Sequence, residues 1–277
     1  VSGLKYEEYV RKNILLPLGM KRSYFNKKDV ERDGDLAVPY VVTEEGVITP
    51  SKYPWGITAD GGLISNVHDM SKYILMYLNE GILNEVRVAS KETIEAMIKP
   101  RINLPYKVFG DEKYGFGWSI TNNFHGKKLV QHGGSVLVYT AWLGFMPEER
   151  AGVILLANGS GYPLSYIGMY ALTLLLGKDP YESLPQLRFE KLLEKLSGIY
   201  KTYKSTMTAK VYSKGSILYI ETGGKYTKTT TPLFYEKSED NIHYFTTIIG
   251  GRKLVVEFRE KENTIELLYE RYKLVKQ

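Results

Sequence analysis

The chain has 277 residues, of which 43% are hydrophobic and 25% charged, which is ordinary for globular proteins and enough for one large or two smaller domains. It contains no cysteine, so disulfides, thiolate catalysis and cysteine-based metal sites are excluded, and its four histidines do not pair at metal-ligand spacing. The net charge of +6 comes from the residues after 185, whose lysines are scattered over alternating segments, so we expect a solvated face and no nucleic-acid partner.

The first residues, Val1 to Gly3, carry no signal-peptide pattern. The longest uncharged run, residues 151–177, is broken by a glycine-containing turn and by Pro163 into pieces that are short for a membrane span. Together with the lack of cysteine, this favours a cytoplasmic protein with no membrane partner. The chain starts at Val1 without an initiator methionine, and we expect that it begins inside a longer protein.

Helical periodicity begins near the start of the chain. Residues Lys5 to Leu16 place tyrosine, valine and isoleucine on one side and charged side chains on the other, and Pro17 ends this helix. A second helix is predicted from Val67 to Asn79, with Ser65 or Asn66 as its N-cap. Further helices are predicted over residues 90–97, 164–176 and 189–196.

Residues 21 to 60 show no sustained period and are mostly polar or turn-like. A stretch of that length without regular structure in a compact domain is usually functional or lies over a site. Beyond the second helix, Tyr114 to Trp118 opens an antiparallel sheet that continues through His132 to Asn158.

After residue 197 the pattern changes to short segments of alternating apolar and polar residues, separated by turn signals. The predicted strands cover residues 199–204, 207–213, 216–222, 225–229, 233–236, 242–248, 253–259 and 264–274. Such strands can close into a small barrel whose interior is filled by its own side chains. The predicted fold class is therefore α+β: an antiparallel sheet flanked by helices over residues 1–180, a linker and short helix over 181–197, and a small antiparallel β-barrel over 198–277.

The most informative stretch is a strand from Lys128 to Ser135 that contains His132, Gly133 and Gly134. Two adjacent glycines weaken a strand, and their usual meaning is that another group approaches the backbone closely. Histidine can change its charge near neutral pH. The stretch is thus a candidate for holding a substrate and donating an N–H to a developing oxyanion. The alternative is a glycine kink beside a hydrogen-bonded core histidine.

Seven short phrases occur in one order along the first half of the chain: Ser2 to Val10, Pro17 to Met20, Gly61 to Ser65, Leu78 to Gly81, Tyr114 to Trp118, His132 to Gly134 and Leu156 to Asn158. Together they resemble the serine β-lactamase/penicillin-binding-protein-like family of class C type, which includes peptidases, D-amino-acid peptidases and esterases. The resemblance covers about residues 1 to 177. The C-terminal part is similar in its pattern to the lipocalin-like β-barrel appended to some members.

The resemblance implies acyl transfer, in which a serine of a Ser-x-x-Lys motif attacks a carbonyl, a Tyr-x-Asn motif assists proton movement and a Lys/His-x-Gly strand completes the site. His132, Gly133 and Gly134 match the third motif, with histidine where β-lactamases carry lysine, so we expect a peptidase or esterase more than antibiotic hydrolysis. By the same resemblance, the backbone N–H of Ser135 is an oxyanion donor and His132 orients the catalytic tyrosine or meets a substrate carboxylate. Asn158 is a candidate substrate contact, with a simple turn residue as the alternative.

The first two motifs are missing from the positions that the resemblance gives them. Ser2 to Lys5 spells Ser-x-x-Lys, but an exposed chain start cannot enclose an activated serine. Tyr24 to Asn26 and Tyr77 to Asn79 spell Tyr-x-Asn by accident. We therefore expect the later part of a serine hydrolase for peptides or small esters and amides, without cofactor and inactive alone. The alternatives are a non-catalytic ligand-binding or assembly protein, and tyrosine-rich strands that form homo-oligomer contacts.

Overall fold

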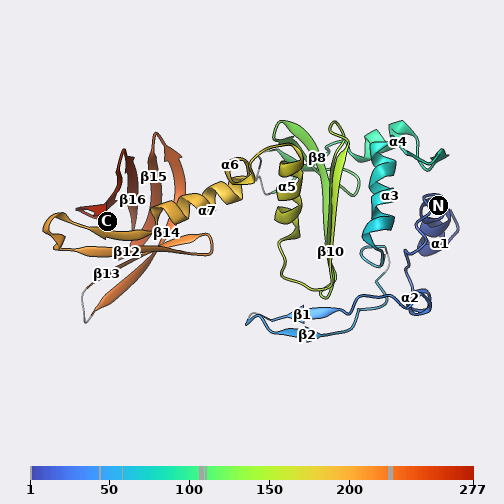
Figure 1. Cartoon of the computed structure of the whole chain (residues 1–277), viewed down its shortest axis with the longest axis horizontal. Coiled ribbons are helices and arrows are strands. Elements are labelled where there is room, and N and C mark those ends of the chain that lie inside the picture. The colour runs from blue at the N-terminus through green and yellow to red at the C-terminus, as the bar shows by residue number, and fades with distance from the viewer. Residues whose placement is uncertain (1, 44, 58, 106–108, 110, 224–226) are drawn as a thin grey trace. The chain divides into compact units, whose positions relative to one another are not determined.

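The computed structural model describes residues 2–43, 45–57, 59–105, 109, 111–223 and 227–277. The chain divides into two compact units, Val1–Pro180 and Tyr181–Gln277 (Figure 1). The first unit contains an antiparallel sheet with helices, and the second contains a closed antiparallel barrel, so the predicted fold class is confirmed. Within the described ranges, no helix is long and apolar enough to cross a membrane.

The helices of the first unit are α1 (Tyr6–Val10), which runs into the π-helix η1 (Arg11–Leu15), then α2 (Lys27–Asp33), α3 (Val67–Leu78), α4 (Lys91–Met97) and α5 (Leu164–Leu175). The side chain of Asn66 accepts a hydrogen bond from the backbone N–H of Asp69, which makes Asn66 the N-cap of α3. The helix α2 and the hairpin of β1 and β2 lie inside residues 21–60, where no regular structure was predicted. The helix α2 was not predictable because it is short and buries only Val30, so it has no apolar stripe.

The strands of the first unit are β1 (Tyr40–Val42), β2 (Ile48–Pro50), β3 (Ile82–Leu83), β4 (Val86–Arg87), β5 (Ile102–Asn103), β6 (Glu112–Tyr114), β7 (Ser119–Phe124), β8 (Lys127–Ser135), β9 (Thr140–Met146) and β10 (Ala151–Ala157). The last six form one sheet in the order β10-β9-β8-β7-β6-β5, with every neighbouring pair antiparallel. β1 pairs with β2 and β3 with β4 in two small hairpins.

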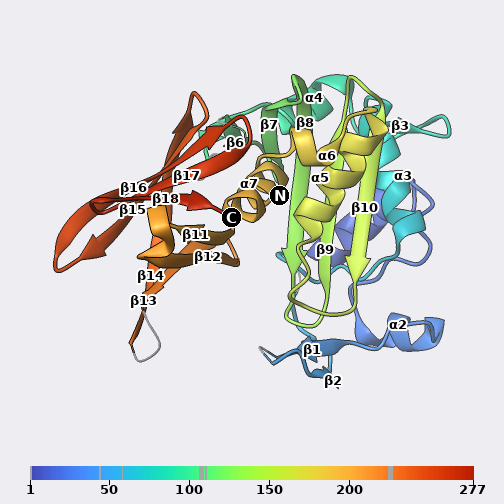
Figure 2. The ribbon, with the colours of Figure 1, turned by 60° about the vertical axis from the view of Figure 1, so that its left-hand side comes forward.

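The helices α3 and α5 cover opposite faces of the large sheet (Figures 1 and 2). Successive side chains of β9 alternate between these faces. Trp142 points to α5, where it packs on Gly168, and Phe145 points to α3, where its ring lies 5.5 Å from that of Tyr77. His132 is directly opposite Leu143 in the register, so its side chain lies on the α3 face.

The second unit begins with α6 (Pro180–Ser183), which spans the boundary, and α7 (Pro185–Leu196). Its barrel consists of β11 (Gly198–Lys201), the short helix η2 (Tyr203–Ser205), β12 (Thr208–Lys214), β13 (Ile217–Gly223), β14 (Lys228–Glu239), β15 (Ile242–Ile249), β16 (Arg252–Lys261), β17 (Thr264–Tyr269) and β18 (Tyr272–Lys276). Pairing of β11 with β18 closes it. One buried cluster, which includes Phe245, Phe258 and residues Leu193 and Leu196 of α7, fills the interior.

Two predicted strand boundaries in the barrel are wrong, and their errors cancel in the count. Residues 225–229 and 233–236 were predicted as two strands, but β14 is one strand that runs through Pro232; residues 225 and 226 themselves lie outside the described ranges. Pro232 is tolerated inside β14 because the strand is paired only with β13 there, so the missing N–H need not cost a ladder hydrogen bond. Conversely, 264–274 is two strands, joined by a turn at Glu270 that carries no glycine.

The helix α7 also starts earlier than predicted, within the expected linker. Pro185 is its first residue, a position where proline fits because its missing N–H would have no helical partner.

Candidate active site

His132 lies on β8 with an exposed side chain, so it is not a core histidine. Its Nδ1 is 2.6 Å from the carbonyl oxygen of Gly133, and its Nε2 is 2.8 Å from the hydroxyl of Tyr114 on β6. Because a carbonyl oxygen only accepts, Nδ1 donates to Gly133, and in the tautomer with a single ring proton Nε2 accepts from the Tyr114 hydroxyl. These two contacts fix both the orientation of the ring and its tautomer.

The backbone N–H of Ser135 points out of the ladder between β8 and β9. The N–H of Val136 donates to the carbonyl of Tyr139 at 3.0 Å, and hydrogen-bonded and non-hydrogen-bonded pairs alternate along antiparallel strands. The next pair, which contains Ser135, is therefore non-hydrogen-bonded, and its N–H points toward the β7 side of β8. On that side the register with β7 reaches only to Gln131. An N–H in this position can donate to a ligand.

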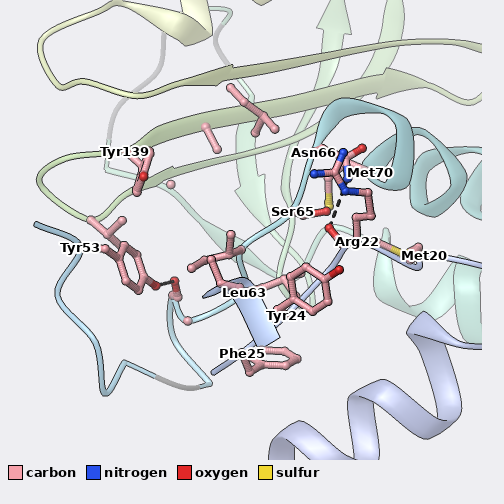
Figure 3. Close-up of a pocket in the computed structure, with 18 of the residues that line it drawn as sticks. Met20, Arg22, Tyr24, Phe25, Tyr53, Leu63, Ser65, Asn66, Met70 and Tyr139 are labelled. Carbon is pink, nitrogen blue, oxygen red and sulfur yellow. Dashed lines mark hydrogen bonds between the residues drawn. The ribbon is translucent and has the colours of Figure 1, made fainter. Parts of the chain in front are cut away.

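A cavity of about 850 Å³ lies on the α3 face of the sheet, with His132, Gly134 and Ser135 in its wall. This volume is within the range of roughly 300–1,000 Å³ that is typical of small-molecule sites. Most of the lining is apolar and comes from α1, η1, α3 and the segments around residues 20–25 and 59–67. Figure 3 shows the residues Tyr53 and Tyr139 on one side, Leu63, Tyr24 and Phe25 along the cavity, and Arg22, Asn66 and Met70 on the other side.

Arg22 and two aspartates form a charged cluster in the cavity wall. Nη2 of Arg22 lies 2.6 Å from Oδ1 of Asp33 and 2.7 Å from Oδ2 of Asp35. The hydroxyl of Tyr24 donates to Asp33 at 2.6 Å. The hydrogen bond from Arg22, and then that from Tyr24, holds the pKa of Asp33 well below its usual value, and the bond to Asp33 raises the pKa of Tyr24. Near neutral pH these groups are fixed charges and dipoles, and none is poised for proton transfer.

The buried carboxylate of Asp69 fixes this part of the wall to α3. It accepts hydrogen bonds from the backbone N–H of Arg22 at 2.7 Å, from the hydroxyl of Ser23 at 3.0 Å and from Nζ of Lys72 at 2.7 Å. Burial acts to raise the pKa of Asp69, but the hydrogen bonds from Lys72, Arg22 and Ser23 outweigh it, and the pKa is lowered. The charged carboxylate therefore fixes the position of the chain at Arg22 and Ser23 relative to α3.

The remaining predicted site residues lie in two different environments. Asn158, at the end of β10, lines the cavity, but its Nδ2 donates to the carbonyl of Val38 at 2.8 Å and its own carbonyl accepts from Tyr40 at 2.9 Å. It thus anchors the segment that leads into β1. Gly133 is opposite Trp142 in the register and lies on the α5 face, away from the cavity that Gly134 lines.

The accidental motif matches have structural roles. Ser2 accepts a hydrogen bond from the N–H of Leu4 and is not among the residues that line the cavity. Asn26 caps α2 by accepting from the N–H of Asp29. Tyr77 is buried against Met97.

Sequence reasoning missed Tyr114 as the partner of His132 and missed Arg22 with its aspartates altogether. Tyr114 was noted only as part of the phrase that opens the sheet. The signal for its role is the strand order: β6 lies two strands from β8, so the end of one is near the glycines of the other. The contact of Arg22 with Asp33 depends on the fold of residues 21–60, which had no periodicity to indicate it.

Comparison with known proteins places this geometry in a family. Residues 1–178 match the family model described as Beta-lactamase. The chain belongs to the beta-lactamase family. The resemblance predicted from the sequence is thereby confirmed, and homologues with the beta-lactamase fold are serine hydrolases. Residues 180–275 match a second model, described as the Pab87 octamerisation domain.

Three relatives extend the comparison. The solved structure of the octameric penicillin-binding protein homologue from Pyrococcus abyssi is 46% identical, with a TM-score of 0.83 and coverage of 99% of this chain and 61% of that one. A penicillin-binding protein of Bacillus subtilis is 26% identical over 246 residues, which are 81% of this chain and 52% of that protein. A protein described as a D-alanyl-D-alanine carboxypeptidase from Salmonella typhi is 22% identical over 192 residues, or 60% of this chain and 43% of that protein. This beta-lactamase family chain therefore spans about half the length of the relatives it matches.

Proposed function

We propose that this chain forms one wall of the active site of a serine hydrolase, a peptidase or esterase that works through an acyl-enzyme. The observation that carries the proposal is the exposed His132 and the outward N–H of Ser135 beside the same cavity. The backbone N–H of Ser135 donates to the oxyanion of the tetrahedral intermediate, where such a donor stabilises developing charge. His132 orients the catalytic tyrosine or meets a substrate carboxylate, and it gives up its contact with Tyr114 to do so.

The glycines and Asn158 contribute to substrate binding in this proposal. Gly134 leaves the backbone open on the cavity side, and Gly133 acts through its backbone alone because it faces α5. Asn158 uses one amide hydrogen for Val38, and the rest of its carboxamide is available to a substrate. The relatives named for penicillin binding and D-alanyl-D-alanine cleavage support a D-amino-acid peptide as the substrate. The nucleophile comes from polypeptide other than this chain, which is inactive alone.

We also propose that residues 180–275 assemble copies of the chain into a homo-oligomer. The match of this region to the Pab87 octamerisation domain supports the proposal, as does the octameric state in the name of the Pyrococcus abyssi homologue.

A fusion protein tests the catalytic proposal. It joins the part of the Pyrococcus abyssi homologue that this chain does not cover to the start of this chain. We expect the fusion to hydrolyse p-nitroanilides of D-alanine faster than those of L-alanine. His132→Ala in the fusion should lower kcat/KM by roughly 100-fold or more, the usual effect of losing a positioned acid–base or electrostatic group.

His68→Ala is the matched control, because His68 is exposed and is not among the residues that line the cavity. An unchanged kcat/KM in His132→Ala would overturn the assigned role. Stoichiometric labelling of the unfused chain by a fluorophosphonate or a penicillin, followed by intact mass measurement, would overturn the claim that the chain lacks its nucleophile.

A further inference from the structure

The barrel leaves large apolar side chains on its outer surface, where neither ligand binding nor strand pairing accounts for them. Its interior is already filled by the buried cluster around Phe245 and Phe258. Its strands form a closed ring in which every strand has two neighbours, with β14 lacking the second neighbour over residues 228–233 and β15 lacking it beyond Thr246. The side chains on the outside of the ring therefore remain as a surface for association.

The outer apolar side chains are concentrated on three consecutive strands. Phe234 on β14 and Val255 on β16 are each 50% exposed, and both are directly opposite Thr246 of β15 in the register. Ile248, which is 72% exposed, lies two residues beyond Thr246 and so on the same face. We call Phe234, Ile248 and Val255 the outer patch. Exposed apolar side chains that gather in this way mark an interaction surface.

Charged groups beside the outer patch are already paired. Oε1 of Glu236 accepts from Nζ of Lys253 and from the hydroxyl of Thr246, both at 2.8 Å. Lys253 is directly opposite Ile248 in the register. The hydrogen bond from Lys253, followed by that from Thr246, lowers the pKa of Glu236, so the pair stays charged and nearly neutral overall. A surface of this kind can meet an identical surface without repulsion between like charges.

We propose that the outer patch is the apolar centre of an interface between two copies of this chain. The inference rests on the proposed homo-oligomer and assigns its contact surface to β14, β15 and β16. The occupant is a second copy because the octamerisation-domain match covers these strands and because the paired Glu236 and Lys253 suit a self-complementary contact. The three apolar side chains form the desolvated centre of the contact, and the polar groups form its rim.

Light scattering coupled to size exclusion tests the proposal on the whole chain. The wild-type chain should have a mass several times the 31.6 kDa of one copy. Ile248→Glu buries an unpaired charge at the centre of the interface. It should raise the dissociation constant of the oligomer by about 30-fold or more and lower the measured mass of the particle at micromolar concentration. Val255→Glu, made separately, should do the same, so that misfolding of one variant does not decide the outcome.

Ile199→Glu is the matched control. Ile199 is 39% exposed on β11, which is halfway around the barrel from β15. This variant should keep the wild-type mass, and all variants should keep the wild-type far-ultraviolet circular dichroism. If the wild-type chain is oligomeric and both patch variants keep its mass, the outer patch is not the interface between copies, and a different partner would have to cover it. A monomeric wild type would overturn both the assembly and the patch.

Discussion

Gly168→Ala is expected to destabilise the first unit, although the same change usually stabilises a helix. Gly168 lies in α5, and a Cβ added there would be 2.1 Å from Cζ3 and 2.2 Å from Cε3 of Trp142. On the other side the ring already lies close against Gly144 of its own strand, where an added Cβ would be 2.1 Å from Cη2, so it has little room to retreat. Its Nε1 donates to Oε1 of Gln131 at 2.9 Å, on the residue before His132. Pressure on this ring therefore reaches the strand that carries the candidate site.

The magnitude follows from two opposing contributions. Alanine is favoured over glycine in a helix interior by about 1 kcal/mol. Against this, helix and ring must separate by at least 1.3 Å, the difference between 2.1 Å and the 3.4 Å at which ordinary contacts begin. Overpacking a filled core costs about 1–3 kcal/mol and occasionally more, and a ring confined between two glycines belongs at the upper end. We expect a net loss of about 2 kcal/mol, which lowers Tm by about 4–8 °C for a unit of this size.

Differential scanning calorimetry measures the effect, because the two units can unfold in separate transitions. Trp142→Phe provides the matched background: without the outer part of the indole, Gly168→Ala should become neutral or stabilising, so the two changes couple. A rise in Tm on Gly168→Ala in the presence of Trp142 would refute the packing argument.

Three further changes have expected outcomes. Asp69→Asn should lower the free energy of unfolding by about 2 kcal/mol near pH 7, because it weakens a buried acceptor of several donors. The pKa of Asp69 is lowered in the folded chain, so this stability is present above pH 3.8 and is lost between pH 3.8 and the folded pKa. The Tm difference from wild type should therefore close in acid, and a constant difference would contradict the assignment. Burial, and then the charge of Lys178, lowers the pKa of His125 below 6.5 in the folded chain. As the pH falls, the imidazole of the unfolded chain is protonated first, so the free energy of unfolding should decrease below pH 6.5. Thermal melts of His125→Gln should show a smaller dependence of Tm on pH in this range, and an equal dependence in the two proteins would refute the argument. Gly134→Ala should raise the free energy of unfolding by about 0.5 kcal/mol, and with it Tm, because the φ of Gly134 is not left-handed and a Cβ would meet nothing closer than 3.9 Å. A marked fall in Tm would show that the glycine is needed for packing.

Elements with a clear apolar period were predictable from the sequence. The helix α3 has an apolar face and an N-cap at Asn66, and both were visible in the pattern. The strand with His132 was visible because apolar residues flank a glycine pair. The short, polar α2 has an N-cap at Asn26 but no apolar period, and it was not predicted. The strand β14 was predicted as two strands, although it continues through Pro232.

The candidate site was predictable only as far as a single strand reaches. His132 and the N–H of Ser135 belong to β8 and could be assigned together. Tyr114 could not, since its contact with His132 depends on the order of β6, β7 and β8 in the sheet. The alternation of β8 also separates what the sequence presented as one motif, because adjacent glycines face opposite sides of a sheet.

This separation bears on why two glycines follow His132. A Cβ on Gly133 would be 3.7 Å from the carbonyl oxygen of Ala141, and one on Gly134 would be 3.9 Å from the Cβ of the same residue, both ordinary contacts. Neither glycine has a left-handed φ, so neither packing nor backbone conformation within the described residues requires glycine there, in contrast to Gly168. Since glycine weakens a strand, its use here needs another reason. Close approach of a substrate backbone to β8 supplies one on the cavity side, at Gly134, and supports the proposed acyl-transfer site where internal packing does not account for the sequence.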